Sequence, residues 1–221
     1  MEKNVTRTLI VLAVILGLFT LACVQVQANP FREQGEKSTR QFKLKPGLYL
    51  FEVDHRGFSN FKIDFRQAGG AVIKNLAQGV GPYLGITVVG IPKTEQGENA
   101  GEGEAPMFYI AGETDGEWIV SVKSTINEPG KRNFSGTTET RDATPVFKLK
   151  AGTYDFKVKH TGGRQFSAVL LNNYGAKVED LASGIGSVTE TKRVKIPRES
   201  DFIIDITASG EWTIEVDEVL N

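Results

Sequence analysis

The stretch that decides the fold is Tyr154-Asp155-Phe156-Lys157-Val158-Lys159-His160, in which aromatic or apolar residues alternate with charged ones. A period of two is typical of a β-strand that buries one face and exposes the other. The stretch from Tyr49 to His55 places Tyr, Phe, Val and His on one face in the same order. No segment after residue 28 has helical periodicity. The sequence therefore predicts an all-β protein built from antiparallel sheets that cover each other.

This stretch lies within a duplicated unit. Residues 42–92 align without a gap on residues 147–197 at an offset of 105, and 20 of these 51 positions are identical. The copies close on Gly116-Glu117-Trp118 and Gly210-Glu211-Trp212, where the offset is 94, so the first copy carries 11 additional residues. Each copy is about 80–100 residues long, which suffices for its own core. We expect two tandem antiparallel β-sandwich domains of jelly-roll-like type, each with about seven short strands.

The duplication sets the expected domain boundaries. We assign residues 1–28 to a signal segment, 29–40 to a tether, 41–123 to the first module, 124–144 to a linker and 145–221 to the second module. The linker is rich in Thr, Asn, Gly and charged residues, and it contains Pro129-Gly130 at an expected turn. This composition predicts mobility between the modules.

The N-terminus has the pattern of an export signal. Lys3 and Arg7 precede an apolar stretch that is short for a membrane span, and Val26-Gln27-Ala28 supplies small residues for cleavage before Asn29. The alternative is lipidation of Cys23, because Thr20-Leu21-Ala22-Cys23 fits a permissive bacterial lipoprotein box. Either way, we expect an exported protein that is periplasmic, bound to the cell envelope or extracellular.

Composition narrows the function classes. The chain has 26 basic and 27 acidic residues without a basic run, which argues against nucleic acid or an anionic membrane as a partner. Membrane contact is expected only through the signal segment or a lipid anchor. Cys23 is the single cysteine and precedes the folded part, so disulfides, Cys-based zinc sites and thiol nucleophiles are excluded there. We expect no cofactor.

Three features that the two copies share resemble a known class of module. They are the run His55-Arg56-Gly57-Phe58-Ser59-Asn60-Phe61, the turn Gly79-Val80-Gly81 and the closing strand Gly116-Glu117-Trp118-Ile119-Val120-Ser121-Val122. The second copy matches through His160, Gly162, Phe166, Gly184, Gly186 and the stretch 210–216. This pattern resembles a β-sandwich repeat module of secreted bacterial and archaeal proteins, and it is broadly similar to jelly-roll accessory domains of secreted hydrolases. The resemblance implies fold and export, with binding of surfaces, glycans or proteins, but no chemistry.

The histidines and tryptophans of both copies are expected to be structural. His55 and His160 are in phase with the inward face at a strand end, where a ring nitrogen can bond a turn carbonyl. Trp118 and Trp212 are in phase with the apolar residues that follow them, which places them in the core.

Two sets of residues are candidates for binding. If the ligand is a glycan, exposed aromatic side chains should gather on one face, and Phe58, Tyr83 and Tyr174 are the candidates near turns. The insertion of the first copy contains carboxylates on a Gly-rich stretch, which either bind Ca²⁺ or form a solvated acidic loop. These carboxylates are Glu95, Glu98, Glu102 and Glu104.

No catalytic motif is present: the sequence has no Gly-x-Ser-x-Gly, no His-Glu-x-x-His and one histidine per module. We therefore expect a non-catalytic exported binding protein or structural protein of the cell envelope. Its partner would be a glycan or an envelope protein. One alternative is an assembly subunit that docks through sheet edges, and a weaker one is a hydrolase with a carboxylate pair that only the fold brings together.

Overall fold

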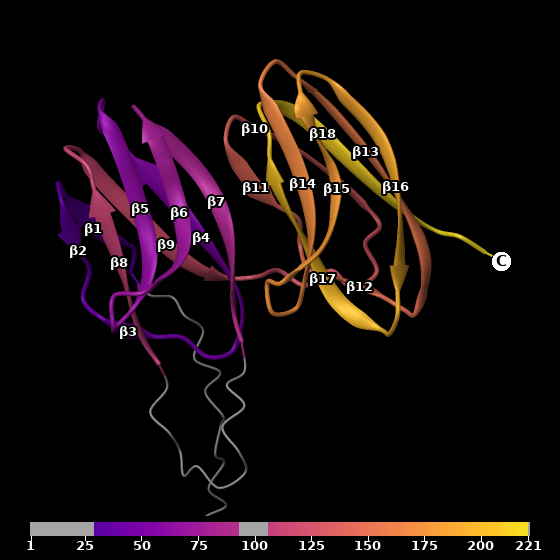
Figure 1. The fold of residues 1–221 in the computed structure, drawn as a ribbon, viewed down its shortest axis with the longest axis horizontal. Helices are drawn as coiled ribbons and strands as arrows, with labels where there is room; N and C mark the ends of the chain where they lie inside the picture. The colour runs from indigo at the N-terminus through magenta and orange to yellow at the C-terminus, as the bar shows by residue number, and fades with distance from the viewer. Residues whose placement is uncertain (1–28, 93–105, 221) are drawn as a thin grey trace, which may run out of the picture.

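The computed structural model describes residues 29–92 and 106–220, and every regular element in these ranges is a β-strand. Figure 1 shows two modules side by side, the first in indigo to magenta and the second in orange to yellow. The strands of the first module are β1 (Phe31–Gln34), β2 (Lys37–Ser38), β3 (Phe42–Lys43), β4 (Gly47–His55), β5 (Asn60–Gln67), β6 (Val72–Val80), β7 (Tyr83–Ile91), β8 (Met107–Glu113) and β9 (Glu117–Ser124). Those of the second are β10 (Asn133–Thr138), β11 (Arg141–Ala143), β12 (Phe147–Leu149), β13 (Gly152–Gly162), β14 (Gln165–Asn172), β15 (Lys177–Ile185), β16 (Val188–Ile196), β17 (Ser200–Thr207) and β18 (Gly210–Glu218). In the part of the chain that the structure describes, no helix is long and apolar enough to cross a membrane.

The two modules have the same topology. In the first, one sheet has the order β1-β9-β4-β7 and the other β2-β8-β5-β6, with β3 paired to β8. In the second, the orders are β10-β18-β13-β16 and β11-β17-β14-β15, with β12 paired to β17. Each strand of the first module thus corresponds to the strand nine numbers later. With β3 and β12 set aside, the eight strands of each module form two four-stranded antiparallel sheets in the strand order of a jelly roll. The expectation of two jelly-roll-like sandwiches is confirmed.

The duplicated unit begins earlier than the aligned sequence indicates. Residues 29–40 were expected to be a tether and 124–144 a linker, but β1 and β2 lie in the former and β10 and β11 in the latter. Both pairs are edge strands of the sheets that follow them. Seven strands follow the edge pair in each module, β3–β9 and β12–β18, so the edge pair brings each module to nine. A further pair of equivalent residues marks the extension, because the hydroxyl oxygens of Thr39 and Thr144 accept bonds from the N–H groups of Ile110 and Ile204 at 3.1 and 3.0 Å.

Each sandwich has its own core, formed by the inward faces of the alternating strands. Tyr49, Phe51 and Val53 of β4 are buried, as are Tyr154, Phe156 and Val158 of β13. Trp118 and Trp212 also belong to the two cores and are buried, as expected. Burying these large side chains is the main favourable term for each module, and the two cores are separate clusters.

A third apolar cluster joins the modules. Leu48, Leu50 and Val88 on the outer face of β4 and β7 pack against an outer face of the second module. The contributors from the second module are Val146, Val169, Leu171 and Ile203, with Ala143 at the margin. In Figure 1, β7 correspondingly lies beside β11. The predicted mobility between the modules is therefore wrong, because apolar side chains that face outward from both sandwiches are buried only when the sandwiches stack.

The two copies differ in sequence where this stacking requires it. The positions of Leu48, Leu50 and Val88 correspond, at the offset of 105, to Thr153, Asp155 and Arg193. The outer face of β13 and β16 is accordingly polar, and Arg193 forms a 2.7 Å ion pair with Asp155 on it. The second module thus turns one apolar outer face to the first module and the polar outer face of β13 and β16 to solvent.

Polar contacts fix the register of the junction. The hydroxyl of Thr140, in the β10–β11 turn, donates to the carbonyl oxygen of Leu84 at the start of β7. The Arg141 guanidinium donates to the hydroxyl oxygen of Thr87 at 3.0 Å. At the other end of β7, Gly90 lies against the backbone of Tyr174. The first module is therefore held along the full length of β7.

Candidate functional site

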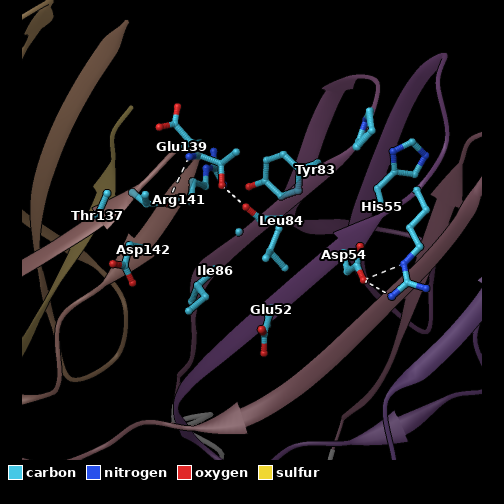
Figure 2. A pocket seen from close by; sticks show the side chains of 15 residues that line it. Glu52, Asp54, His55, Tyr83, Leu84, Ile86, Thr137, Glu139, Arg141 and Asp142 are labelled. Carbon is cyan, nitrogen blue, oxygen red and sulfur yellow. Dashed lines mark hydrogen bonds and ion pairs between the residues drawn. The ribbon is translucent and has the colours of Figure 1, made fainter. Parts of the chain in front are cut away.

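A groove of about 800 Å³ lies at the junction of the modules. Its floor is the upper part of the outer face of β4 and β7, which the second module leaves uncovered. Its wall is the segment Thr137–Asp142, which turns from β10 into β11. Figure 2 shows this segment facing Leu84 and Ile86, with Glu52 and Asp54 on the neighbouring strand. A volume of 300–1,000 Å³ is typical of ligand sites.

The floor of the groove combines apolar and acidic side chains. Leu84 lies directly across from Asp54 in the β4–β7 pairing, and Ile86 lies across from Glu52. All four point outward because their inward neighbours on the same strands fill the core. Leu84 is 61% exposed and Ile86 is partly exposed, so the floor presents apolar surface to the groove.

Ion pairs at the surface hold the carboxylates of the floor. The Arg56 guanidinium donates to Asp54 at 2.7 Å and to Glu117 at 3.2 Å, and Lys123 pairs with Glu52. Hydrogen bonding to Asp54 is the main cause of the raised pKa of Arg56. These pairs are half-exposed and screened by solvent, so a ligand can rearrange them at small cost.

Two further groups that line the groove have a less polar setting, Asp142 of the wall and Tyr83 at the start of β7. Burial raises the pKa of Asp142, although the N–H of Ala143, which donates to its carboxylate at 2.8 Å, acts in the opposite direction. Burial also raises the pKa of Tyr83, which begins β7 and packs its ring against Phe61 at 5.6 Å. Perturbed titratable groups in a concavity are a physical marker of a functional site.

The three aromatic candidates do not gather on one face. Phe58 is 84% exposed in the β4–β5 turn, whereas Tyr83 lines the groove and is only partly exposed. Tyr174 lies in the β14–β15 turn beside Gly90, near the opposite end of β7. Seven residues of strand separate Tyr83 from Gly90, or about 23 Å. The arrangement therefore offers no shared aromatic platform.

The histidines occupy equivalent structural sites. Nδ1 of His55 donates to the carbonyl oxygen of Gly81 at 2.8 Å, and Nδ1 of His160 donates to that of Gly186 at 2.9 Å. Both glycines have φ near +84°, a conformation that favours glycine. The imidazoles stack on Phe61 and Phe166, with centroid distances of 4.2 and 4.5 Å. Each histidine thus fixes the turn between two strands, as expected.

The remaining candidates lie outside the described residues. Glu95, Glu98, Glu102 and Glu104 fall within 93–105, and Cys23 falls within 1–28. Within residues 29–92 and 106–220, no group of three His, Cys, Asp or Glu side chains is placed to hold a metal ion.

Sequence reasoning missed the groove because its wall lies in the presumed linker and its floor on an outer face. One signal was available in the aligned copies. Leu84 and Ile86 correspond to Thr189 and Thr191, and Glu52 and Asp54 correspond to Lys157 and Lys159. A change from apolar to polar and from acidic to basic at four neighbouring positions marks a surface that the fold alone does not dictate.

Comparison with known proteins adds little to the fold. No family model matches the chain, and no curated protein matches it. Among solved structures, it is similar to Bacteroides uniformis beta-glucuronidase 2 covalently bound to cyclophellitol-6-carboxylate aziridine, with 10% identity and a TM-score of 0.22. The match covers 78% of this chain and 22% of that chain, so this chain spans about a fifth of its length.

Proposed function

We propose that this protein is a non-catalytic, exported binding protein whose ligand site is the groove at the junction of its two modules. The observation that carries the proposal is the way the groove is built, with a floor from the first module and a wall from the second. Packing along β7 fixes floor and wall relative to each other, so little order has to be gained on binding. The resemblance to secreted binding modules supports the same class of function.

The groove suits binding better than catalysis. Its carboxylates at positions 52 and 54 are engaged with Lys123 and Arg56, and the nearby His55 is buried with Nδ1 bonded to a turn carbonyl. Nε2 of His55 does contact the Thr114 hydroxyl at 2.6 Å, but Thr114 is not among the residues that line the groove, so this pair presents no nucleophile to a ligand there. The apolar and acidic floor instead offers contact area with polar groups beside it, which is the general composition of a ligand site.

A thermal-shift screen tests the proposal. The chain 29–221 would be heated with Ca²⁺, soluble cell-wall and plant glycans, and short basic or acidic peptides. A ligand at 100 times its Kd should stabilise the native state by about 2.7 kcal/mol. The matched control is the double variant Leu84→Thr/Ile86→Thr, which carries the residues that the second copy has at these positions. The proposal requires a ligand whose shift is lost in this variant; a shift that the variant retains places the site elsewhere.

A second candidate function is assembly through sheet edges. The nine-residue strands β6 and β15 lie at sheet edges and end on Val80 and Ile185, equivalent residues that are 73% and 84% exposed. Edge strands with exposed apolar residues are sites of strand addition. This function predicts concentration-dependent association. The variant Val80→Lys/Ile185→Lys should abolish the association, whereas Leu84→Thr/Ile86→Thr should leave it unchanged.

A further inference from the structure

We propose that the groove binds an extended polypeptide segment with basic side chains two residues apart, of the form Arg-x-Arg or Lys-x-Lys. This inference rests on the proposed function and names its ligand class. The observation behind it is the pairing of one acidic and one apolar side chain at two successive positions of the floor, Asp54 with Leu84 and Glu52 with Ile86.

Each pair has the composition that accommodates an arginine or lysine side chain. These side chains have an apolar stem that packs on apolar surface and a charged head that remains near water or a carboxylate. Directly opposite residues on one face of an antiparallel pair have Cβ atoms about 4.5–5.5 Å apart. A basic side chain can therefore lay its stem on Leu84 and place its head at Asp54, and a second can do the same at Ile86 and Glu52.

The spacing of the two pairs selects the conformation of the ligand. Residues two apart on a strand lie on the same face and are separated by about 6.6 Å. Leu84 and Ile86 are two apart, as are Asp54 and Glu52. An extended segment has the same repeat, so its residues at i and i+2 match the two pairs while the residue between them points away from the floor.

The charge of the groove agrees with a basic ligand. Its lining contains four acidic residues, Glu52, Asp54, Glu139 and Asp142, and two arginines, Arg56 and Arg141, which gives a net charge of 2 − 4 = −2. The Arg141 guanidinium already donates a hydrogen bond to the Thr87 hydroxyl at the junction. Arg56 and Lys123 already pair with Asp54 and Glu52, and both pairs are exposed, so an incoming basic side chain adds to them or displaces them at small cost.

The second module provides an internal comparison. Its equivalent positions carry Lys157 opposite Thr191 and Lys159 opposite Thr189. The same strands thus form with basic and hydroxyl side chains at these four positions. The fold therefore does not require the acidic and apolar side chains that the first module has at these four positions, which is consistent with a role in binding.

A glycan fits these residues less well. Saccharide rings are commonly bound on an exposed aromatic face, whereas the ring of Tyr83 is partly buried and packs against Phe61. The remaining aromatic candidates, Phe58 and Tyr174, are not among the residues that line the groove.

The experiment is a calorimetric titration of the chain 29–221 with three acetylated and amidated peptides at low salt. They are Thr-Arg-Thr-Arg-Thr, its permutation Thr-Arg-Arg-Thr-Thr and the acidic Thr-Glu-Thr-Glu-Thr. The first should bind at least fivefold more tightly than the permutation, because adjacent arginines of an extended chain point to opposite sides. The acidic peptide should show no binding. Equal affinity of the first two peptides would overturn the Arg-x-Arg arrangement.

Two double variants and a matched control locate the binding. Glu52→Gln/Asp54→Asn should weaken binding of Thr-Arg-Thr-Arg-Thr at least tenfold, and Leu84→Thr/Ile86→Thr at least fivefold. The control Asp155→Asn/Asp217→Asn removes a cross-strand carboxylate pair from the outer face of β13 and β18 and should leave binding unchanged. If the control lost as much affinity for the peptide as Glu52→Gln/Asp54→Asn, the binding would reflect non-specific charge attraction and the groove would not be the site.

The outcomes separate this inference from the proposed function. If no basic peptide binds but a glycan does, and Leu84→Thr/Ile86→Thr abolishes glycan binding, the ligand class is wrong and the groove remains the site. If a ligand is found whose binding is indifferent to both groove variants, the proposed function fails together with the inference.

Discussion

Gly90 lies against Tyr174 so closely that a Cβ atom at residue 90 would be 1.8 Å from the carbonyl oxygen of Tyr174. The two residues belong to different modules, and the contact is between backbone and backbone. The equivalent residue of the second copy is Lys195, which faces solvent. The absence of a side chain at residue 90 is therefore what allows the sandwiches to approach along β7.

This contact predicts the effect of Gly90→Ala. The methyl group cannot be accommodated by rotation of a side chain, so the variant should lose roughly 1–3 kcal/mol, as overpacked sites do. Urea unfolding should show this loss, or should separate into two transitions if the junction opens. Gly163→Ala is the matched control, because a Cβ there meets no atom within 4 Å. A single transition with unchanged midpoint in Gly90→Ala would contradict the packing of the modules.

The buried hydroxyls of Thr39 and Thr144 give a second prediction. Replacing either residue by Val keeps the shape but leaves the N–H of Ile110 or Ile204 without its acceptor, at a cost of about 1–3 kcal/mol. Thr189→Val, at an exposed position, should change stability by less than about 0.5 kcal/mol. Denaturant midpoints would compare the three; a null effect at Thr39 would mean that β2 does not continue into the first module as described.

Asp64 predicts a dependence of stability on pH. Burial alone would raise its pKa, but hydrogen bonds from Asn75, Lys62 and Arg66 outweigh burial and lower it. A carboxyl with a lowered folded pKa stabilises the protein above its unfolded pKa of about 3.8, and this contribution is lost as pH falls through the folded value. Asp64→Asn should thus cost roughly 1.5–3 kcal/mol at pH 7. The difference from the parent protein should shrink below pH 4, and a pH-independent difference would speak against ionised Asp64.

Asp205 should behave in the opposite sense. Burial at the junction raises its pKa, and Lys74 and Arg141 offset this only in part. One of its carboxylate oxygens is buried without a hydrogen-bond partner. A raised folded pKa means that ionisation costs stability as pH rises through and above the unfolded value. Asp205→Asn should therefore raise the unfolding midpoint at pH 7 and leave it unchanged at pH 3; a lower midpoint at pH 7 would show that the charge stabilises the junction.

The inward faces could be predicted from sequence because burial imposes a period of two that is independent of partners. Tyr49, Phe51 and Val53 point to a core whichever strands pair with β4. The first strand of each module was not predicted. Phe31 and Phe134 are equivalent, because they pair with Val120 and Ile214, but their offset is 103 instead of 105 and few identities surround them. Thr39 and Thr144 were the remaining signal.

The junction and its groove could not be derived from alternation, since outward positions are expected to be polar or variable. What identifies them is a difference between copies. Leu48, Leu50 and Val88 are aligned with Thr153, Asp155 and Arg193. When only one copy of a duplicated fold has an apolar outer face, that face is expected to pack against another surface. The part that remains uncovered, around Leu84 and Ile86, is the floor of the groove.

The most direct test of the groove as the ligand site is an NMR titration of the chain 29–221, labelled at Leu and Ile methyl groups, with Thr-Arg-Thr-Arg-Thr and with any ligand that the thermal-shift screen identifies. The account predicts saturable shifts of the Leu84 and Ile86 methyl signals, while those of Ile185 on the β15 edge stay in place. Saturable shifts confined to Ile185 or to other residues away from the groove would contradict it.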